Sequence, residues 1–173
     1  MSARTKNSFF IFATFVIVSL CIGIVFHSIN ENSLEDQLRQ MDSLSTAVGL
    51  EQLKEAGYID VTGVGAAENP EITRFLEAAA ARRKASLKTY FIENGDLFVK
   101  LFVYDPQLKL IRSWTYEPRK QAEDDPDKRF SITYKTIVKN GIVSIELIHV
   151  QNVSAPAIQT LKNEILYTYH NSD

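Results

Sequence analysis

The three histidines are the side chains of this sequence best suited to act as a general base, and each stands in an unfavourable place. His27 borders a long apolar run, and His170 lies close to the C-terminus. Such positions are seldom rigid enough to hold a catalytic geometry. His149 alternates with apolar residues at the end of an expected strand, which favours a half-buried structural histidine. We therefore expect no catalytic residues and a protein that is not an enzyme.

An acidic cluster between two expected strands is dense enough in oxygen ligands to attract calcium. The spacing lacks the glycine turn and distal glutamate of an EF-hand loop, and Pro126 restricts the backbone, so a solvated loop is the better interpretation. The sequence also offers no cysteine and histidine cluster, phosphate-binding glycine turn or nucleophile elbow. We therefore expect no metal and no cofactor. The acidic residues are Glu123, Asp124, Asp125 and Asp127.

Aromatic residues concentrate in the expected strands, where they would either line a ligand groove or pair across a sheet and fill its core. The second arrangement is the commoner one on adjacent antiparallel strands. Residues 97–104 are apolar on both faces apart from Lys100, which predicts a central strand covered by helices on one side and by another layer on the other side, for which a partner is one candidate. The aromatic residues are Tyr90, Phe91, Phe98, Phe102, Tyr104, Trp114, Tyr116, Phe130 and Tyr134.

The composition is that of a globular protein, with 45% hydrophobic and 23% charged residues. A formal net charge of −2 argues against a nucleic-acid partner. Cys21 is the only cysteine, so no intrachain disulfide can form and stability must come from the core.

Residues 9–26 form an uncharged apolar run that would span roughly 27 Å as a helix, enough to cross a bilayer. Arg4 and Lys6 precede the run, which predicts a cytoplasmic N-terminus and an extracytoplasmic domain. Few small residues offer a cleavage site, so an uncleaved signal-anchor is favoured over a removed signal. The predicted division is a cytoplasmic tail over 1–8, a transmembrane helix over 9–26, an amphipathic stalk helix over 27–57 and an extracytoplasmic domain over 58–173.

Two helices should precede the strands. The first begins at Ser33 and ends at Gly57, with apolar residues at helical spacing between them. A short strand over 58–61 follows. Asn69 and Pro70 then begin a second helix that should reach about Ala85. Its buried stripe is predicted to be Ile72, Phe75, Leu76 and Ala79.

From residue 87 onward apolar residues recur with the period of strands, and turn-forming dipeptides separate these apolar runs. Asn94-Gly95 and Asn140-Gly141 predict tight hairpins, and Asp105-Pro106 predicts a further turn. Residues 117–128 should form an exposed loop, and a last amphipathic helix should begin near Pro156. The predicted strands are 87–92, 97–104, 108–116, 130–139 and 142–150.

These elements predict an α+β fold: an N-terminal transmembrane helix, then helices packed on an antiparallel sheet of five or six strands, with a C-terminal helix. The layout resembles a type IV pilin or pseudopilin, although no processing glycine precedes the apolar run and the family's early glutamate is absent. It is also similar to the NTF2-like cone found in secretion-channel subunits. That resemblance implies inward-facing polar residues, for which Lys100, Thr133, Lys135 and Glu146 are the candidates.

The absence of a catalytic constellation favours a non-catalytic, membrane-anchored subunit of an envelope assembly of the pilus or secretion type. Its partners would be the membrane and other membrane or envelope proteins, with a homo-oligomer as a further possibility. The alternative is an extracytoplasmic ligand-binding or sensory module of a membrane complex.

Overall fold

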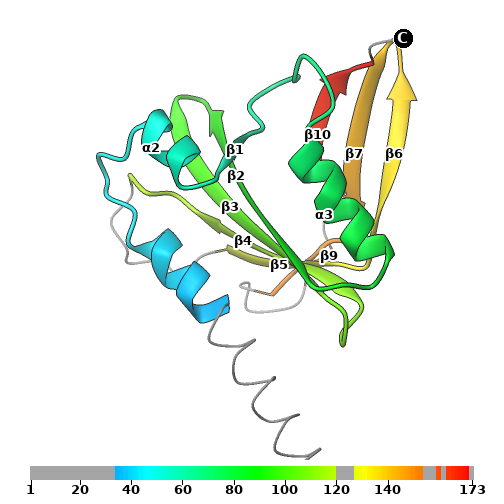
Figure 1. Ribbon diagram of the computed structural model, residues 1–173, viewed down its shortest axis with the longest axis horizontal. Coiled ribbons are helices and arrows are strands. Elements are labelled where there is room, and N and C mark those ends of the chain that lie inside the picture. The colour runs from blue at the N-terminus through cyan, green and yellow to red at the C-terminus, as the bar shows by residue number, and fades with distance from the viewer. Residues whose placement is uncertain (1–33, 120–126, 154–158, 161–162, 172–173) are drawn as a thin grey trace, which may run out of the picture. The chain divides into compact units, whose positions relative to one another are not determined.

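The computed structural model describes residues 34–119, 127–153, 159–160 and 163–171. The chain divides into two compact units, Met1–Gln40 and Met41–Asp173. The described residues of the first unit, 34–40, are helical. The described part of the second unit holds helices α2 (Leu50–Glu55) and α3 (Pro70–Ala80) and strands that form two sheets (Figure 1).

The larger sheet has the strand order β1-β2-β3-β4-β5-β8-β9. Its neighbours are antiparallel except for β1, which runs parallel to β2. The tight turn between β2 and β3 places Asn94 and Gly95 at φ 52° and 90°, as a type I′ turn requires. The strands are β1 (Ile59–Asp60), β2 (Ala85–Glu93), β3 (Asp96–Asp105), β4 (Leu110–Tyr116), β5 (Asp127–Ser131), β8 (Gln151–Asn152) and β9 (Gln159–Thr160).

The smaller sheet has the order β10-β7-β6, with β6 (Thr133–Lys139), β7 (Ile142–Ile148) and β10 (Glu164–His170) all antiparallel. β5 and β6 are consecutive, as are β7 and β8, so one two-stranded ribbon passes from one sheet into the other. The Ser131 hydroxyl lies 2.8 Å from the carbonyls of Thr133 and Ile148 at this bend. On the other strand of the ribbon, His149 has a φ of 56° and interrupts the strand between β7 and β8. Bends of this kind let strands change sheets.

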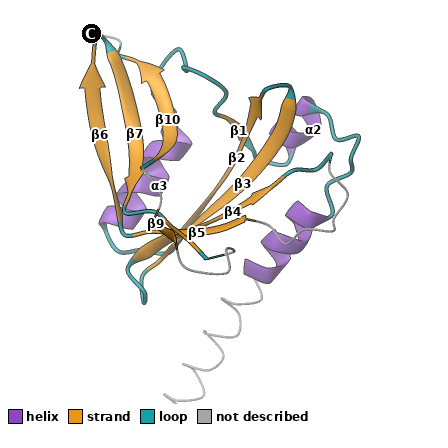
Figure 2. Cartoon of the chain, turned by 180° about the vertical axis from the view of Figure 1, so that it is seen from behind, coloured by secondary structure: helices purple, strands orange, loops and turns teal. Residues whose placement is uncertain are grey.

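Helix α3 packs between the two sheets (Figures 1 and 2). Asn69 caps its first turn by accepting hydrogen bonds from the amides of Glu71 and Ile72, and Pro70 supplies the preset φ of the first position. Its buried stripe belongs to one hydrophobic cluster with Leu87 and Phe102 of the larger sheet and residues of β7 and β10 of the smaller one. Each large apolar side chain so buried contributes about 1.5–3 kcal/mol. The stripe is Ile72, Phe75, Leu76 and Ala79, as predicted.

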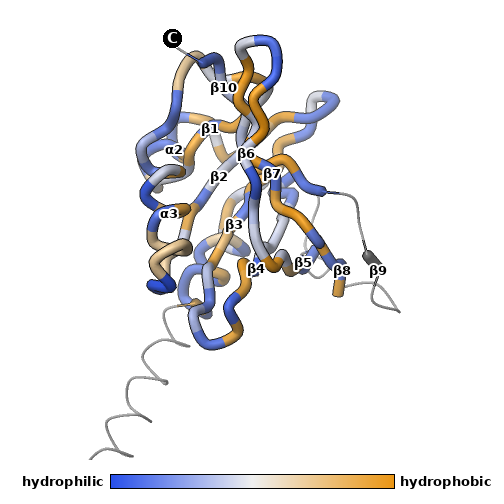
Figure 3. Tube along the Cα trace, turned by 90° about the vertical axis from the view of Figure 1, so that its right-hand side faces the viewer, coloured by the Kyte–Doolittle hydropathy of each residue, from blue (hydrophilic) through white to orange (hydrophobic). Residues whose placement is uncertain are grey.

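The opposite face of the larger sheet is also apolar and buried. β3 therefore carries buried residues on both faces, as expected of a central strand. Hydrophobic stretches of the strands end in hydrophilic turns (Figure 3). Buried residues of this second face include Tyr90, Leu97, Val99, Leu101, Val103, Trp114 and Tyr116, with Leu53 of α2 and Tyr58 also buried.

The segment between β1 and α3, residues 61–69, is here called the strap. It joins edge strand β1 of the larger sheet to edge strand β10 of the smaller sheet. The amide of Gly65 donates to the carbonyl of Thr168 at 2.7 Å, and the amide of His170 donates to the carbonyl of Gly65 at 3.0 Å. A Cβ on Gly65 would lie 1.9 Å from the hydroxyl oxygen of Tyr167, so only glycine fits here. The Tyr167 hydroxyl donates to the carbonyl of Ala67 at 2.8 Å, which fixes the ring over the strap.

The predicted fold class is wrong in its sheet count and in its C-terminal element. Two sheets replace the single sheet of five or six strands, because the predicted strand over 130–139 bends at Ile132 into β5 and β6. The predicted C-terminal helix is instead β10 at its described end. A register shift between Ile165 and Tyr167 buries the adjacent Leu166 and Tyr167 together, which removes the alternation by which a strand is recognised.

The N-terminal predictions also need correction. The predicted transmembrane helix over 9–26 lies outside the described residues. Within the described ranges no helix combines the length and apolar character needed to cross a bilayer, so the predicted single-pass membrane location has no support from any described helix. The predicted stalk helix is broken, since residues 34–42 and α2 are helical while residues 43–49 between them are not. The pilin-like layout requires one long helix there, so neither that layout nor a secretion role is supported.

Other local predictions are confirmed. The Asn140-Gly141 turn has both residues at positive φ, and the short strand over 58–61 appears as β1. Helix α3 begins at Pro70 as predicted and ends at Ala80, earlier than expected. Residues 120–126 of the predicted loop lie outside the described part of the chain, and Asp127 and Lys128 already belong to β5.

The contact between Gly65 and Tyr167 yields a first prediction. Gly65→Ala should lower the free energy of unfolding by about 1–3 kcal/mol, the usual cost of overpacking, as measured by urea denaturation. In a Tyr167→Phe background the nearest atom is removed, so the same substitution should cost less. An equal cost in both backgrounds, or no cost in either, would show that Tyr167 does not lie against the strap.

Candidate binding pocket

A row of polar side chains crosses the larger sheet on the face that carries α3. Thr89 of β2 pairs with Lys100 of β3, Lys100 with Thr115 of β4, and Thr115 with Asp127 of β5. Directly paired residues share one face of a sheet, so these four side chains lie in a line across four strands. Arg129 lies on the same face, two residues along β5 from Asp127.

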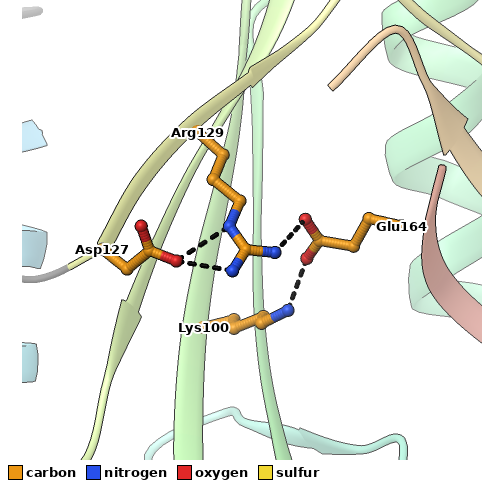
Figure 4. Close-up of polar contacts among 4 residues, drawn as sticks. All are labelled: Lys100, Asp127, Arg129 and Glu164. Atoms are coloured by element: carbon orange, nitrogen blue, oxygen red, sulfur yellow. Dashed lines mark hydrogen bonds and ion pairs between the residues drawn. The ribbon is translucent and has the colours of Figure 1, made fainter. Parts of the chain in front are cut away.

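Glu164, the first residue of β10, reaches this row from the smaller sheet (Figure 4). One carboxylate oxygen pairs with the Lys100 amine, and the other accepts from Arg129 Nη1 at 3.1 Å. Arg129 in turn contacts Asp127 Oδ2 through Nη2 at 2.6 Å and Nε at 2.8 Å. Two cations and two carboxylates thus form a continuous network that joins the sheets.

Burial makes this network energetically consequential. The Glu164 side chain is 8% exposed and that of Lys100 is 13% exposed, whereas the chain's surface ion pairs are largely solvated. Burial alone would disfavour the charge of Arg129, but the carboxylates of Glu164 and Asp127 outweigh it and raise the pKa of the guanidinium. Loss of one partner from a buried network leaves an uncompensated charge, which is costly.

A pocket of about 290 Å³ opens beside the network, between β2 and β3 of one sheet and β10 of the other. Phe102, Leu166 and Tyr167 line it and also belong to the core under α3, so the pocket begins where the core ends. Burial raises the pKa of Tyr167, as expected for a phenol in this position. The remaining lining residues are Val61, Thr62, Gly63, Thr89, Phe91, Ile92, Glu93, Lys100, Ile165 and Thr168.

The pocket wall holds polar hydrogen-bonding capacity that the chain leaves unused. The Thr89 side chain is fully buried, and its hydroxyl has no hydrogen-bond partner. Buried hydroxyls nearly always have one, so this exception requires an explanation. Lys100 stands directly opposite Thr89, and its amine lies 5.1 Å from the centre of the Phe91 ring. Phe91 stacks on Phe98 at 5.0 Å between ring centres, which holds this wall in place.

The histidines and acidic residues that were weighed and set aside as candidates for chemistry are not brought together in the described part of the chain. His149 is exposed at the bend rather than half-buried, and His170 is exposed at the end of β10. Of the predicted acidic cluster only Asp127 lies in the described part of the chain, where it contacts Arg129. The described residues include no group of three or more side chains placed to bind a metal.

Of the four candidates for inward-facing polar residues, only Lys100 lines the pocket. Thr133 is exposed, and Lys135 contacts Glu146 at 3.2 Å on the outer face of the smaller sheet. An amide group of Asn163 also donates to Glu146, and these two contacts lower the pKa of that carboxyl, Asn163 more strongly.

Sequence reasoning missed Thr89, Arg129 and Glu164. The pattern around Glu164 predicts a helix, which hides its relation to Lys100, and Arg129 lies at the junction between a predicted loop and a predicted strand. One signal was available: Lys100 is the single polar residue of an otherwise apolar strand segment, so its amine needs a carboxylate from another element.

No family model, curated protein or solved structure matches this chain. The residues of the pocket are thus the basis for a functional proposal.

Removing the charge of a buried carboxylate of this network should destabilise the fold much more than removing the charge of an exposed one. Glu164→Gln should lower the free energy of unfolding by about 2–4 kcal/mol, because Lys100 and Arg129 would be left with Asp127 alone. The matched control is Glu51→Gln, whose carboxylate is 82% exposed and pairs with Lys54; its cost should stay below about 1 kcal/mol. Equal costs in chemical denaturation would mean that Glu164 does not join the two sheets.

Proposed function

We propose that the domain is a non-catalytic binding module that takes up a small molecule in the pocket between β2, β3 and β10. The observation that carries the proposal is the buried Thr89 hydroxyl, which has no partner and lies in the wall of a preformed pocket. Ligand sites are typically apolar cavities with a few convergent polar groups. This pocket fits that description, with aromatic and aliphatic walls and Lys100 beside Thr89.

The size of the pocket limits the ligand. A volume of about 290 Å³ lies at the lower end of the range for ligand sites and equals the share of roughly ten water molecules in the liquid. A single ring or a short branched chain with one polar group would fill it. The ion-pair network supports uptake of such a ligand because it fixes β10 against the larger sheet, so the pocket requires little rearrangement.

Protein contact is a second candidate function, favoured by the outer edge of β6. In the described part of the chain no strand pairs with that edge, and Val138 on β6 is 63% exposed. An unpaired edge with exposed apolar side chains is a template for strand addition. The occupant would be a second copy of the chain, paired through β6 about a twofold axis.

Fragment binding tests the pocket. The full-length chain, labelled for two-dimensional NMR, is screened against neutral and charged fragments of up to about 12 heavy atoms. We expect several to shift the amides of Thr89, Lys100 and Leu166. Ile165→Asp places a charge at the pocket wall and should abolish these shifts, whereas Ile132→Asp should not. These isoleucines are 60% and 61% exposed, so the substitutions are matched in solvation. Absence of any fragment mapping to the pocket would refute the proposal.

Analytical ultracentrifugation tests whether the edge of β6 pairs with a second copy of the chain. If β6 pairs with a second copy, wild-type protein should dimerise with rising concentration, and Val138→Lys should weaken the association at least about tenfold. A wild type that stays monomeric throughout, or a variant that dimerises equally well, excludes this interface.

A further inference from the structure

We propose that the ligand of this pocket is uncharged, with a hydrogen-bond acceptor placed between Lys100 and Thr89 and an apolar body against the aromatic wall. This inference rests on the proposed function and specifies its ligand class. It follows from the charge balance of the wall, from unused donor capacity and from the distribution of apolar side chains.

The charge balance excludes an ionised ligand. Lys100 and Arg129 are balanced by Glu164 and Asp127, so the network beside the pocket has no net charge. A ligand carboxylate next to Lys100 would also approach Glu164, and Glu93 lines the same pocket. A ligand ammonium would approach Lys100. Glu93 itself is exposed and solvated, so neither ion would gain a buried partner of opposite charge in return for leaving water, and an uncompensated charge is expensive to bury.

The hydrogen-bond donors that remain unused at the pocket wall favour a ligand with an acceptor atom. The Lys100 ammonium has three hydrogens, and among the described residues its only hydrogen bond goes to Glu164. The Thr89 hydroxyl can donate or accept. These two side chains project from the same face of the sheet at paired positions of β2 and β3. A carbonyl or hydroxyl oxygen beside Lys100 would accept from the cation, and hydrogen bonds to charged donors are the stronger ones. A small shift of the buried Thr89 side chain toward that oxygen would give its hydroxyl the missing partner.

The rest of the pocket suits an apolar body. Phe91 and Phe102 form one wall, Val61 approaches from the segment after β1, and Ile165 and Leu166 approach from β10. Phe91 lines the pocket and stacks on Phe98, so the pocket wall offers ring surface against which an aromatic or aliphatic group can pack. A ring bearing one acceptor matches both the polarity and the volume.

Five probes that share a benzene ring test separately the effects of ligand charge and of a hydrogen-bond acceptor: benzyl alcohol, benzamide, benzoate, benzylamine and toluene. Each is titrated into the full-length chain at neutral pH and followed by the pocket amides. Benzyl alcohol and benzamide should bind at least about tenfold more tightly than benzoate or benzylamine, because the charged probes must be desolvated. They should bind roughly fivefold more tightly than toluene, which lacks the acceptor.

A charge-changing variant sharpens the test. Lys100→Met keeps an apolar stem but leaves Arg129 against two carboxylates, so the pocket becomes acidic. Benzylamine should then become the best of the five probes. Lys135→Met, which removes an amine from a Lys–Glu pair on the outer face of the smaller sheet, should leave the wild-type order unchanged.

The outcomes distinguish the two proposals. If benzoate or benzylamine binds wild type best, or if Lys100→Met leaves the order unchanged, the inference about ligand class is overturned while the pocket remains a binding site. If none of the probes and no library fragment shifts the pocket amides, the proposed function itself fails.

Discussion

The contact of Glu164 with Lys100 and Arg129 is the interaction on which the described domain depends. One carboxylate from the smaller sheet pairs with two cations of the larger sheet, at 8% side-chain exposure. Other links between the sheets are apolar or lie at their margins: the core under α3, the Gly65 strap and the bend at Ser131. Apolar packing is not directional, so it leaves the separation of the sheets adjustable, whereas an ion pair with fixed partners sets it.

The pocket follows from how the gap between the sheets is filled. Helix α3 occupies one part of that gap with Ile72, Phe75 and Leu76, and the core ends near Phe102. Further along β2 and β3 the inward positions are Thr89 and Lys100, which cannot make an apolar core. Glu164 neutralises the cation without filling the space, so a cavity remains with a partnerless hydroxyl in its wall. Apolar residues here would be the more stable choice, and this departure from an apolar core is the basis of the binding role proposed above.

The sequence was most informative where local chemistry decides structure. Asn69-Pro70 predicted the start of α3, because an asparagine side chain can cap the first turn and proline presets its φ. Asn94-Gly95 and Asn140-Gly141 predicted the hairpins, because few residues adopt positive φ readily. It failed where tertiary contacts override the local pattern. The bend at Ile132 divides one predicted strand between two sheets. The register shift before Tyr167 interrupts the alternation of buried and exposed residues in β10, so its sequence pattern predicts a helix. Lys100 stood out as a buried cation needing a partner, but nothing near it in the chain identifies Glu164, which lies on a strand that was not predicted.

A double-mutant cycle tests the joining of the sheets most directly. The free energies of unfolding are measured by urea denaturation for wild type, Lys100→Met, Glu164→Gln and the variant carrying both substitutions. If the two side chains interact across the sheets as described, the double variant should be more stable than the sum of the single losses predicts, by at least about 1 kcal/mol. Additive losses would contradict the account, because Glu164 would then contribute to stability without contacting Lys100.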